Sequence, residues 1–328
     1  MSACSLLIDR DDIAYSDSDA VTNINATVET TPVLTSGDAA DDPAIWIHPS
    51  DPNKSFVIGT NKKSGLGVYD LNGKQIQFLE GGLPNNIDIR QNVLLQNDSV
   101  DIGAFTDRQD NTVGWITISE NGIEKFNQFP VKEEPYGFCL GYYANSVFAF
   151  VTYKTGLIEQ YELTENDSLL SMSLKASFQF DSQLEGCVVD DERNRIFVGE
   201  EEHGIWVFED IAESLDSPIS IDQVGSANGI VADIEGLALY KADKPKLIAS
   251  SQGNDSFAIY EATPPYAFVS RFRITGSDTV DGAQETDGIE VTHVPLEGFP
   301  NGMIVAQDGF NNDGKQNFKF APLNIEKM

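Results

Sequence analysis

The sequence predicts an all-β protein that folds as a six-bladed β-propeller, and three observations support this prediction. Short apolar runs of strand length recur along the chain. Most of them lead through a polar turn into an alternating segment that ends in an aromatic residue, a pattern typical of half-buried hairpins. The runs share one register, and no amphipathic helix interrupts them. Repeats of short strands in one register are typical of propellers.

The elements are expected in the following order. The apolar runs span 56–60, 101–106, 147–152, 195–199, 246–250 and 302–306. The alternating partners span 67–69, 115–118, 158–161, 205–208, 257–260 and 317–320. Six anchor residues near the ends of the runs, Thr60, Thr106, Thr152, Gly199, Ser250 and Ala306, are separated by 46, 46, 47, 51 and 56 residues. A shared register of six units favours a propeller over a sandwich of unrelated strands.

The repeats leave room for one domain and a short N-terminal arm. We expect the propeller to span 32–328 and residues 1–31 to form a polar tether or a loosely docked arm. Met1-Ser2-Ala3-Cys4 resembles the end of a bacterial lipoprotein signal, so Cys4 is either a lipid-anchored residue or an ordinary N-terminal one. We expect an exported protein, extracellular or periplasmic.

The charge of the chain excludes some classes of partner. The 328 residues contain 21 Lys and Arg against 52 Asp and Glu, a net charge of −31. Nucleic acid is excluded as a partner because its binding requires a basic surface. Hydrophobic residues make up 41% of the chain, which argues against disorder. No apolar run approaches the roughly 20 residues of a membrane helix.

Charged residues recur at the blade spacing in two series. One lies upstream of the apolar runs: Asp42, Asp88, Tyr136, Glu185, Glu235 and Asp287, with Asp41, Asp233 and Asp281 nearby. The other lies two residues after the anchors: Lys62, Arg108, Lys154, Glu201, Gln252 and Asp308. Equivalent positions in successive blades form a ring around the axis, so carboxylates are expected to converge. Oxygen ligands without His or free Cys favour calcium over zinc. The alternative is a solvated acidic surface.

The basic half of the second series predicts an anion site. Lys62, Lys63, Arg108 and Lys154 fall in equivalent turns of three consecutive blades, and Tyr136 adds a hydroxyl. Guanidinium and ammonium groups opposite bound cations suit phosphate. The alternative is that these cations form surface ion pairs of little energetic value.

Motifs throughout the chain carry a family resemblance. They include Asp38-Ala39-Ala40-Asp41-Asp42-Pro43-Ala44-Ile45-Trp46, Thr60-Asn61-Lys62-Lys63-Ser64-Gly65, Asp233-Ile234-Glu235-Gly236-Leu237, Ser250-Ser251-Gln252-Gly253-Asn254 and Gln316-Asn317-Phe318-Lys319. Together they resemble the β-propeller phytases, the calcium-dependent alkaline class best known from bacilli. The resemblance runs from about residue 28 to 322 and touches every blade.

The resemblance implies a phytase of the 3-phytase type, which hydrolyses phytate stepwise to lower inositol phosphates. It places phosphate contacts at Lys62, Lys63, Arg108, Tyr136 and Lys154. It places ligands for several calcium ions at Asp41, Asp42, Glu185, Glu201, Asp233, Glu235, Gln252, Asp281, Asp287 and Asp308. One departure is Thr155, where bacillus members have Glu, and Asp281 lies in a weakly matched stretch.

The expected chemistry is direct attack of a metal-bound water on phosphorus, without a covalent intermediate. The catalytic residues are expected to be Lys62, Arg108, Tyr136, Glu185, Glu201 and Glu235, in a protein that acts as a monomer. A cysteine-phosphatase site is excluded: Cys187 and Arg193 have the right spacing, but three acids lie between them, so Cys187 is expected to be a buried strand residue. Three cysteines cannot make a disulfide framework, and the one pair that they allow would form only by chance of folding. Two alternatives remain, a calcium propeller of the lactonase or phosphotriesterase kind and a non-enzymatic binding propeller.

Overall fold

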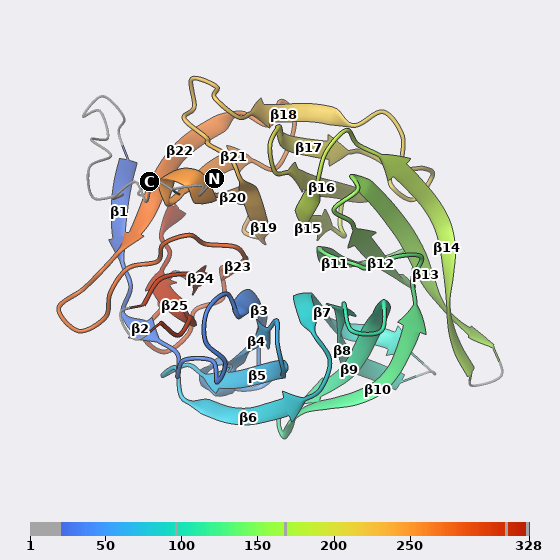
Figure 1. Cartoon of the computed structure of the whole chain (residues 1–328), viewed down its shortest axis with the longest axis horizontal. Coiled ribbons are helices and arrows are strands. Elements are labelled where there is room, and N and C mark those ends of the chain that lie inside the picture. Colours follow the sequence, from blue (N-terminus) through green and yellow to red (C-terminus); the bar gives the residue numbers. More distant parts are fainter. Residues whose placement is uncertain (1–20, 96–97, 167–168, 312–313, 326–327) are drawn as a thin grey trace, which may run out of the picture.

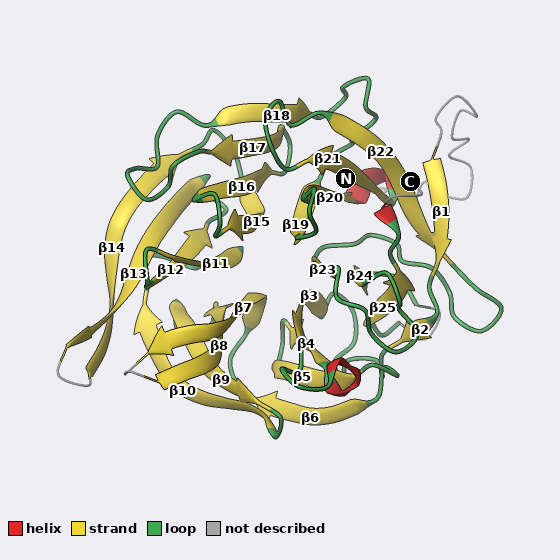
Figure 2. Cartoon of the chain, turned by 180° about the vertical axis from the view of Figure 1, so that it is seen from behind, coloured by secondary structure: helices red, strands yellow, loops and turns green. Residues whose placement is uncertain are grey.

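The computed structural model of this chain describes residues 21–95, 98–166, 169–311, 314–325 and 328. Six sheets surround a central axis, five of four strands and one of five, so the predicted six-bladed β-propeller is confirmed (Figure 1). Helix is confined, in these ranges, to isolated turns such as the 3-10 turns at Pro52–Lys54 and Gln252–Asn254, and loops join the strands (Figure 2). No helix in the described ranges has the length and apolar character needed to cross a membrane.

Each blade is an antiparallel meander that runs outward from the axis. The innermost strands are β3 (Ala40–Trp46), β7 (Pro84–Leu95), β11 (Phe138–Tyr143), β15 (Leu184–Asp190), β19 (Ile234–Tyr240) and β23 (Ile289–Thr292). The second strands are β4 (Phe56–Asn61), β8 (Asp98–Asp107), β12 (Ser146–Thr152), β16 (Arg195–Glu200), β20 (Lys246–Ser251) and β24 (Met303–Asp308). These second strands coincide with the six predicted apolar runs.

The outer half of each blade follows in chain order. The third strands are β5 (Gly65–Asp70), β9 (Thr112–Ser119), β13 (Leu157–Asn166), β17 (Gly204–Phe208), β21 (Ser256–Glu261) and β25 (Asn317–Pro322), which contain the predicted alternating segments. Five blades end in an outer strand of their own: β6 (Gln75–Glu80), β10 (Gly122–Pro130), β14 (Leu169–Gln179), β18 (Ile219–Gln223) and β22 (Phe268–Thr275).

The N-terminal strands complete the last two blades. β2 (Val28–Glu29) pairs antiparallel with β25 and supplies the outer strand of the sixth blade. β1 (Val21–Asn25) pairs parallel with β22 and adds a fifth strand to the fifth blade. Residues 21–29, assigned above to the arm, therefore belong to the sheets of the propeller. Cys4 lies outside the described residues.

The hydrophobic core lies between neighbouring blades rather than in one central layer. One buried cluster joins Ala104 and Trp115 of the second blade to Leu140 and Ala149 of the third. Strand residues alternate in direction, so each sheet buries apolar side chains on both faces. This packing holds the innermost strands side by side around the axis, where the site is built.

A disulfide joins Cys139 on β11 to Cys187 on β15. The sequence left one pair open without identifying it, and Cys187 is a buried strand residue as expected. The physical reason is the repeat: the two cysteines are 48 residues apart, about one blade, so they occupy neighbouring innermost strands with their Cα atoms 5.7 Å apart.

Candidate active site

The register of the hairpins brings the two charged series to the same face. In each blade the start of the innermost strand pairs with the end of the second strand: Ala40 lies opposite Asn61, and Leu184 lies opposite Glu200. Site residues at the start of one strand therefore meet those just past the end of the other. Charges from both series gather at one end of the central axis.

Glycines after the site residues allow neighbouring blades to approach closely. A Cβ atom at Gly137 would lie 1.8 Å from the carbonyl oxygen of Glu185, and one at Gly186 would lie 2.1 Å from that of Glu235. The same contact recurs from Gly236 to Asp287. A side chain at these positions would push adjacent blades apart, which explains the acidic residue followed by glycine in the repeat.

Three carboxylates form the centre of the site. Glu185, Glu201 and Glu235 are buried, and each offers an oxygen within 4.8 Å of the others. At that separation each pair of like charges costs on the order of 3 kcal/mol at an effective dielectric near 20. Burial, followed by the charge of Glu185, raises the pKa of Glu201 to about 7. Burial also raises the pKa of Glu185 and, with the charge of Glu185, that of Glu235.

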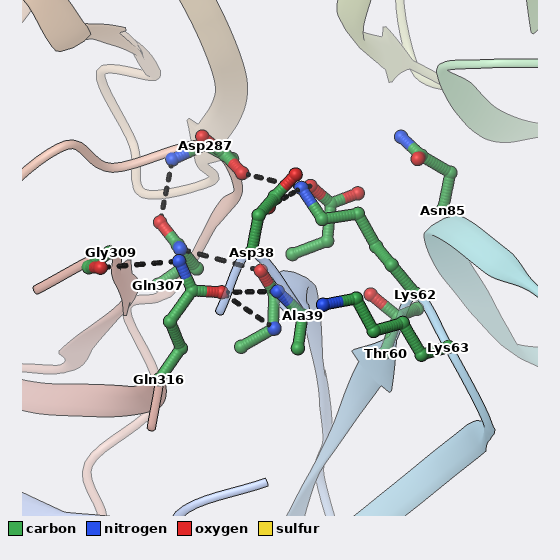
Figure 3. Close-up of polar contacts among 12 residues, drawn as sticks. Asp38, Ala39, Thr60, Lys62, Lys63, Asn85, Asp287, Gln307, Gly309 and Gln316 are labelled. Carbon is green, nitrogen blue, oxygen red and sulfur yellow. Dashed lines mark hydrogen bonds and ion pairs between the residues drawn. The ribbon is translucent and has the colours of Figure 1, made fainter. Parts of the chain in front are cut away.

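A second acidic group surrounds the ammonium of Lys62. Its Nζ lies 3.2 Å from Asp41 Oδ1, 3.0 Å from Asp287 Oδ2 and 2.5 Å from Asp38 Oδ1 (Figure 3). Gln252 Nε2 donates to the other oxygen of Asp287 at 2.7 Å. Burial raises the pKa of Asp41 well above its usual value, and Lys62 opposes that effect. Burial lowers the pKa of Lys62, but Asp41 and Asp287 outweigh it and hold that pKa above its usual range.

The basic side of the site faces these acids. Arg108 donates from Nη2 to the carbonyl oxygen of Lys62 at 3.2 Å, and the described residues provide no carboxylate partner for its guanidinium. Lys154 is exposed, with Nζ 4.3 Å from the centre of the Tyr136 ring. Burial and the charges of Glu185 and Glu235 raise the pKa of Tyr136 far above its usual value, so its hydroxyl remains protonated. Lys63 turns outward and donates to Ser36 O at 2.6 Å.

The oxygen atoms of the site suit a hard cation as ligands. Asp41 Oδ2, Glu235 Oε2 and Asn85 Oδ1 are buried, and no described residue donates a hydrogen bond to them. Unsatisfied buried oxygens of this kind are costly unless a cation or water binds them. Carboxylate and amide oxygens, without His or thiolate, are the ligands that calcium prefers. The cluster therefore suits a metal ion that prefers oxygen ligands.

The structure distributes the other predicted ligands over three places. Asp233 lies beside Glu201 and contributes to its raised pKa. Asp42 instead faces the central channel, where it lines a cavity of about 20 Å³ with Asp88 and Glu290. Asp281 and Asp308 lie at a separate cluster on the buried ammonium of Lys319, together with Glu29.

A carboxylate lies next to Thr155, the position at which this chain departs from the family pattern. Thr155 Oγ1 donates to Glu133 Oε1 at 3.1 Å; Thr155 is exposed next to Lys154, and Glu133 is half-buried. A carboxylate from the preceding loop therefore lies beside the place where bacillus members of the family are expected to have Glu.

Two amide residues at the site did not emerge from the sequence. The fully buried Asn85 donates from Nδ2 to Glu185 Oε1 at 3.0 Å. Gln183 donates from Nε2 to both carboxylate oxygens of Glu201, at 2.6 and 2.8 Å. Both orient a carboxylate of the central cluster. Asn85 and Gln183 each lie within two residues of the start of an innermost strand. That position is the only sequence signal that could have indicated their role.

Comparison with known proteins agrees with this arrangement. A family model described as phytase matches residues 2–326. A 3-phytase of Bacillus subtilis (strain 168) is 40% identical over 318 residues, which is 91% of this chain and 83% of the relative. With carboxylates and cations gathered on one face of the propeller and a match over nearly its whole length, this chain belongs to the phytase family.

Proposed function

We propose that this protein is a calcium-dependent phosphomonoesterase that hydrolyses phytate to lower inositol phosphates and phosphate. The observation that carries the proposal is the buried cluster Glu185, Glu201 and Glu235 with cationic side chains near it. Lys62 and Lys154 are close enough to lower the pKa values of Glu185 and Glu201 against the larger effect of burial, and Arg108, which has no carboxylate partner among the described residues, donates to the carbonyl oxygen of Lys62. Such an arrangement combines cation ligands with fixed positive charge, which together suit a phosphate group. The phytase family match and the relative named 3-phytase support the same activity.

The basic residues bind and orient the phosphate. The planar fork of Arg108 suits two oxygens of one phosphate group, and Lys62 and Lys154 add further positive charge. Since the hydroxyl of Tyr136 keeps its proton, it can donate a hydrogen bond to a phosphate oxygen. These groups stabilise the charge that spreads over the equatorial oxygens when water attacks in line.

The acidic residues hold the cation and control protons. Glu185, Glu201, Glu235, Asp41 and Asp287 would hold calcium, with Asn85 and Gln183 fixing the carboxylates of Glu185 and Glu201. Bound calcium supplies positive charge that neutralises phosphate oxygens and lowers the pKa of water. With its pKa near 7, the carboxyl group of Glu201 exchanges its proton in the pH range where the cluster must ionise.

Two further properties belong to the proposal. The Cys139–Cys187 disulfide supports export, because disulfides persist in oxidising compartments. The substrate is expected to be phytate as its calcium complex, since a chain of net charge −31 repels a bare polyanion. We expect the protein to act as a monomer.

The test is release of phosphate from phytate at pH 7–8, with millimolar calcium and after chelation. The proposal expects release that depends on calcium. Lactone and phosphotriester substrates serve as the comparison. Absence of phosphate release from phytate in the presence of calcium would refute the proposed activity, and release unaffected by chelation would refute the role of calcium.

A further inference from the structure

The ammonium of Lys62 is bound by three carboxylates that differ in their freedom to move. The side chains of Asp41 and Asp287 are 1% and 16% exposed. The side chain of Asp38 is 75% exposed, yet it makes the shortest of the three contacts, 2.5 Å from Nζ to Oδ1 (Figure 3). Lys62 Nζ donates a hydrogen bond to Asp287 Oδ2, whereas Asp41 Oδ1 lies within ion-pair distance but accepts no hydrogen bond. Because Asp38 is the exposed carboxylate of the three, a phosphate group that reaches Lys62 from solvent must compete with it for the ammonium.

The backbone around Asp38 is held on both sides. Thr35 Oγ1 donates to Asn61 Oδ1 at 2.7 Å, and Ser36 O accepts from Lys63 Nζ at 2.6 Å. On the other side, the backbone N–H groups of Ala39 and Ala40 donate to Gln316 Oε1 at 2.6 and 2.9 Å. The loop is therefore anchored, and the exposed side chain of Asp38 is the part that can rotate away from Lys62.

We propose that the carboxylate of Asp38 competes with an incoming phosphate group for the ammonium of Lys62 and is displaced when phosphate binds there. The inference rests on the proposed function, which assigns phosphate binding to Lys62. Asp38 competes with phosphate as an internal anion. The competition acts on substrate and product alike, because both bind through phosphate oxygens. This competition weakens the binding of inorganic phosphate and so favours release of the product after each cleavage.

The test measures binding of inorganic phosphate to the calcium-loaded protein by titration calorimetry, after excess calcium has been removed. Asp38→Asn keeps the shape of the side chain and removes its charge. We expect the variant to bind phosphate about twofold to fivefold more tightly, the range that a displaced exposed ion pair allows. Asp38→Glu retains the carboxylate, and its affinity is expected to stay close to that of the unmodified protein.

The matched control is Asp110→Asn. Asp110 is exposed in the turn that follows Arg108, so this change removes one negative charge near the site without touching Lys62. If both Asn variants tighten phosphate binding equally, the effect comes from net charge and the proposal is overturned. Weaker binding by Asp38→Asn, or Glu behaving like Asn at position 38, also overturns it.

Phytate turnover by the same samples separates this inference from the proposed function. If the unmodified protein releases phosphate from phytate but Asp38→Asn does not bind phosphate more tightly, the role of Asp38 is wrong and the phytase activity stands. If the calcium-loaded protein releases no phosphate from phytate, the proposed function itself fails, and with it the inference that depends on it.

Discussion

Removal of calcium should invert the pH dependence of stability that a protein rich in carboxylates usually shows. Burial and the charge of Glu185 raise the pKa of Glu201 to about 7, against 4.5 for an unperturbed Glu. Between these values the native state binds a proton that the unfolded state does not, so the free energy of unfolding falls as the pH rises. A difference of about 2.5 units, at about 1.4 kcal/mol per unit, amounts to on the order of 3 kcal/mol.

The neighbouring carboxylates act in the same direction. The pKa values of Glu185, Glu235 and Asp41 are also raised by burial, so each adds a further loss of stability as it ionises. Calcium removes this loss by compensating the charges, and it competes with protons for the same oxygens. The stabilisation by calcium should therefore increase from pH 5 to pH 8.

Urea denaturation at 25 °C, at several pH values from 5 to 8, measures the effect on metal-free and calcium-loaded protein. We expect the metal-free protein to be most stable at the acid end of this range and the two curves to separate as the pH rises. Glu201→Gln is the control, because an amide does not titrate and should flatten the metal-free curve. A metal-free protein that is equally or more stable at pH 7 than at pH 5 would refute the argument.

Three further changes test other parts of the molecule. Arg108→Ala should lower kcat/KM for phytate by at least about tenfold. It should leave the urea midpoint nearly unchanged, because the guanidinium has no carboxylate partner among the described residues. Unchanged turnover would show that Arg108 does not contact the substrate. Asn85→Ala removes the buried donor to Glu185 Oε1 and should lower the free energy of unfolding by about 1–3 kcal/mol. Urea denaturation without calcium measures this change. An unchanged free energy of unfolding would mean that Glu185 finds another donor. Replacement of Cys139 and Cys187 by Ala opens a loop of 48 residues and should cost up to about 4 kcal/mol, whereas addition of a thiol reductant should have no effect on the double variant.

The architecture was predictable because the sequence pattern of one blade recurs six times along the chain. Six apolar runs in one register produced six second strands, from β4 to β24, and each alternating partner became a third strand. The face of the site followed as well, since antiparallel pairing places Ala40 opposite Asn61 and so brings Asp41 close to Lys62. Local periodicity and the equivalent positions of successive repeats were therefore enough to predict the strands and the face of the site, without knowledge of side-chain contacts.

Features that depend on a single contact were not predictable. β2 has two residues, too few to show any alternation, and its pairing with β25 depends on chain closure. The series also could not show that Asp308 turns away to Lys319, because direction within a loop depends on local packing. Asn85 and Gln183 have no charge to mark them, and their roles are visible only once Glu185 and Glu201 are in place.

The pairing of β2 with β25 has a consequence for the order of folding. The sixth blade receives its outer strand from residues 28–29, and its third strand spans residues 317–322. Blades one to four, and strands β19 to β22 of the fifth, can form from neighbouring segments as the chain emerges, but the sixth blade requires both β2 and β25. Its completion therefore carries the largest loop-closure cost in the molecule. The innermost strand of that blade begins two residues after Asp287, so the ring of site residues becomes complete only in the last step of folding.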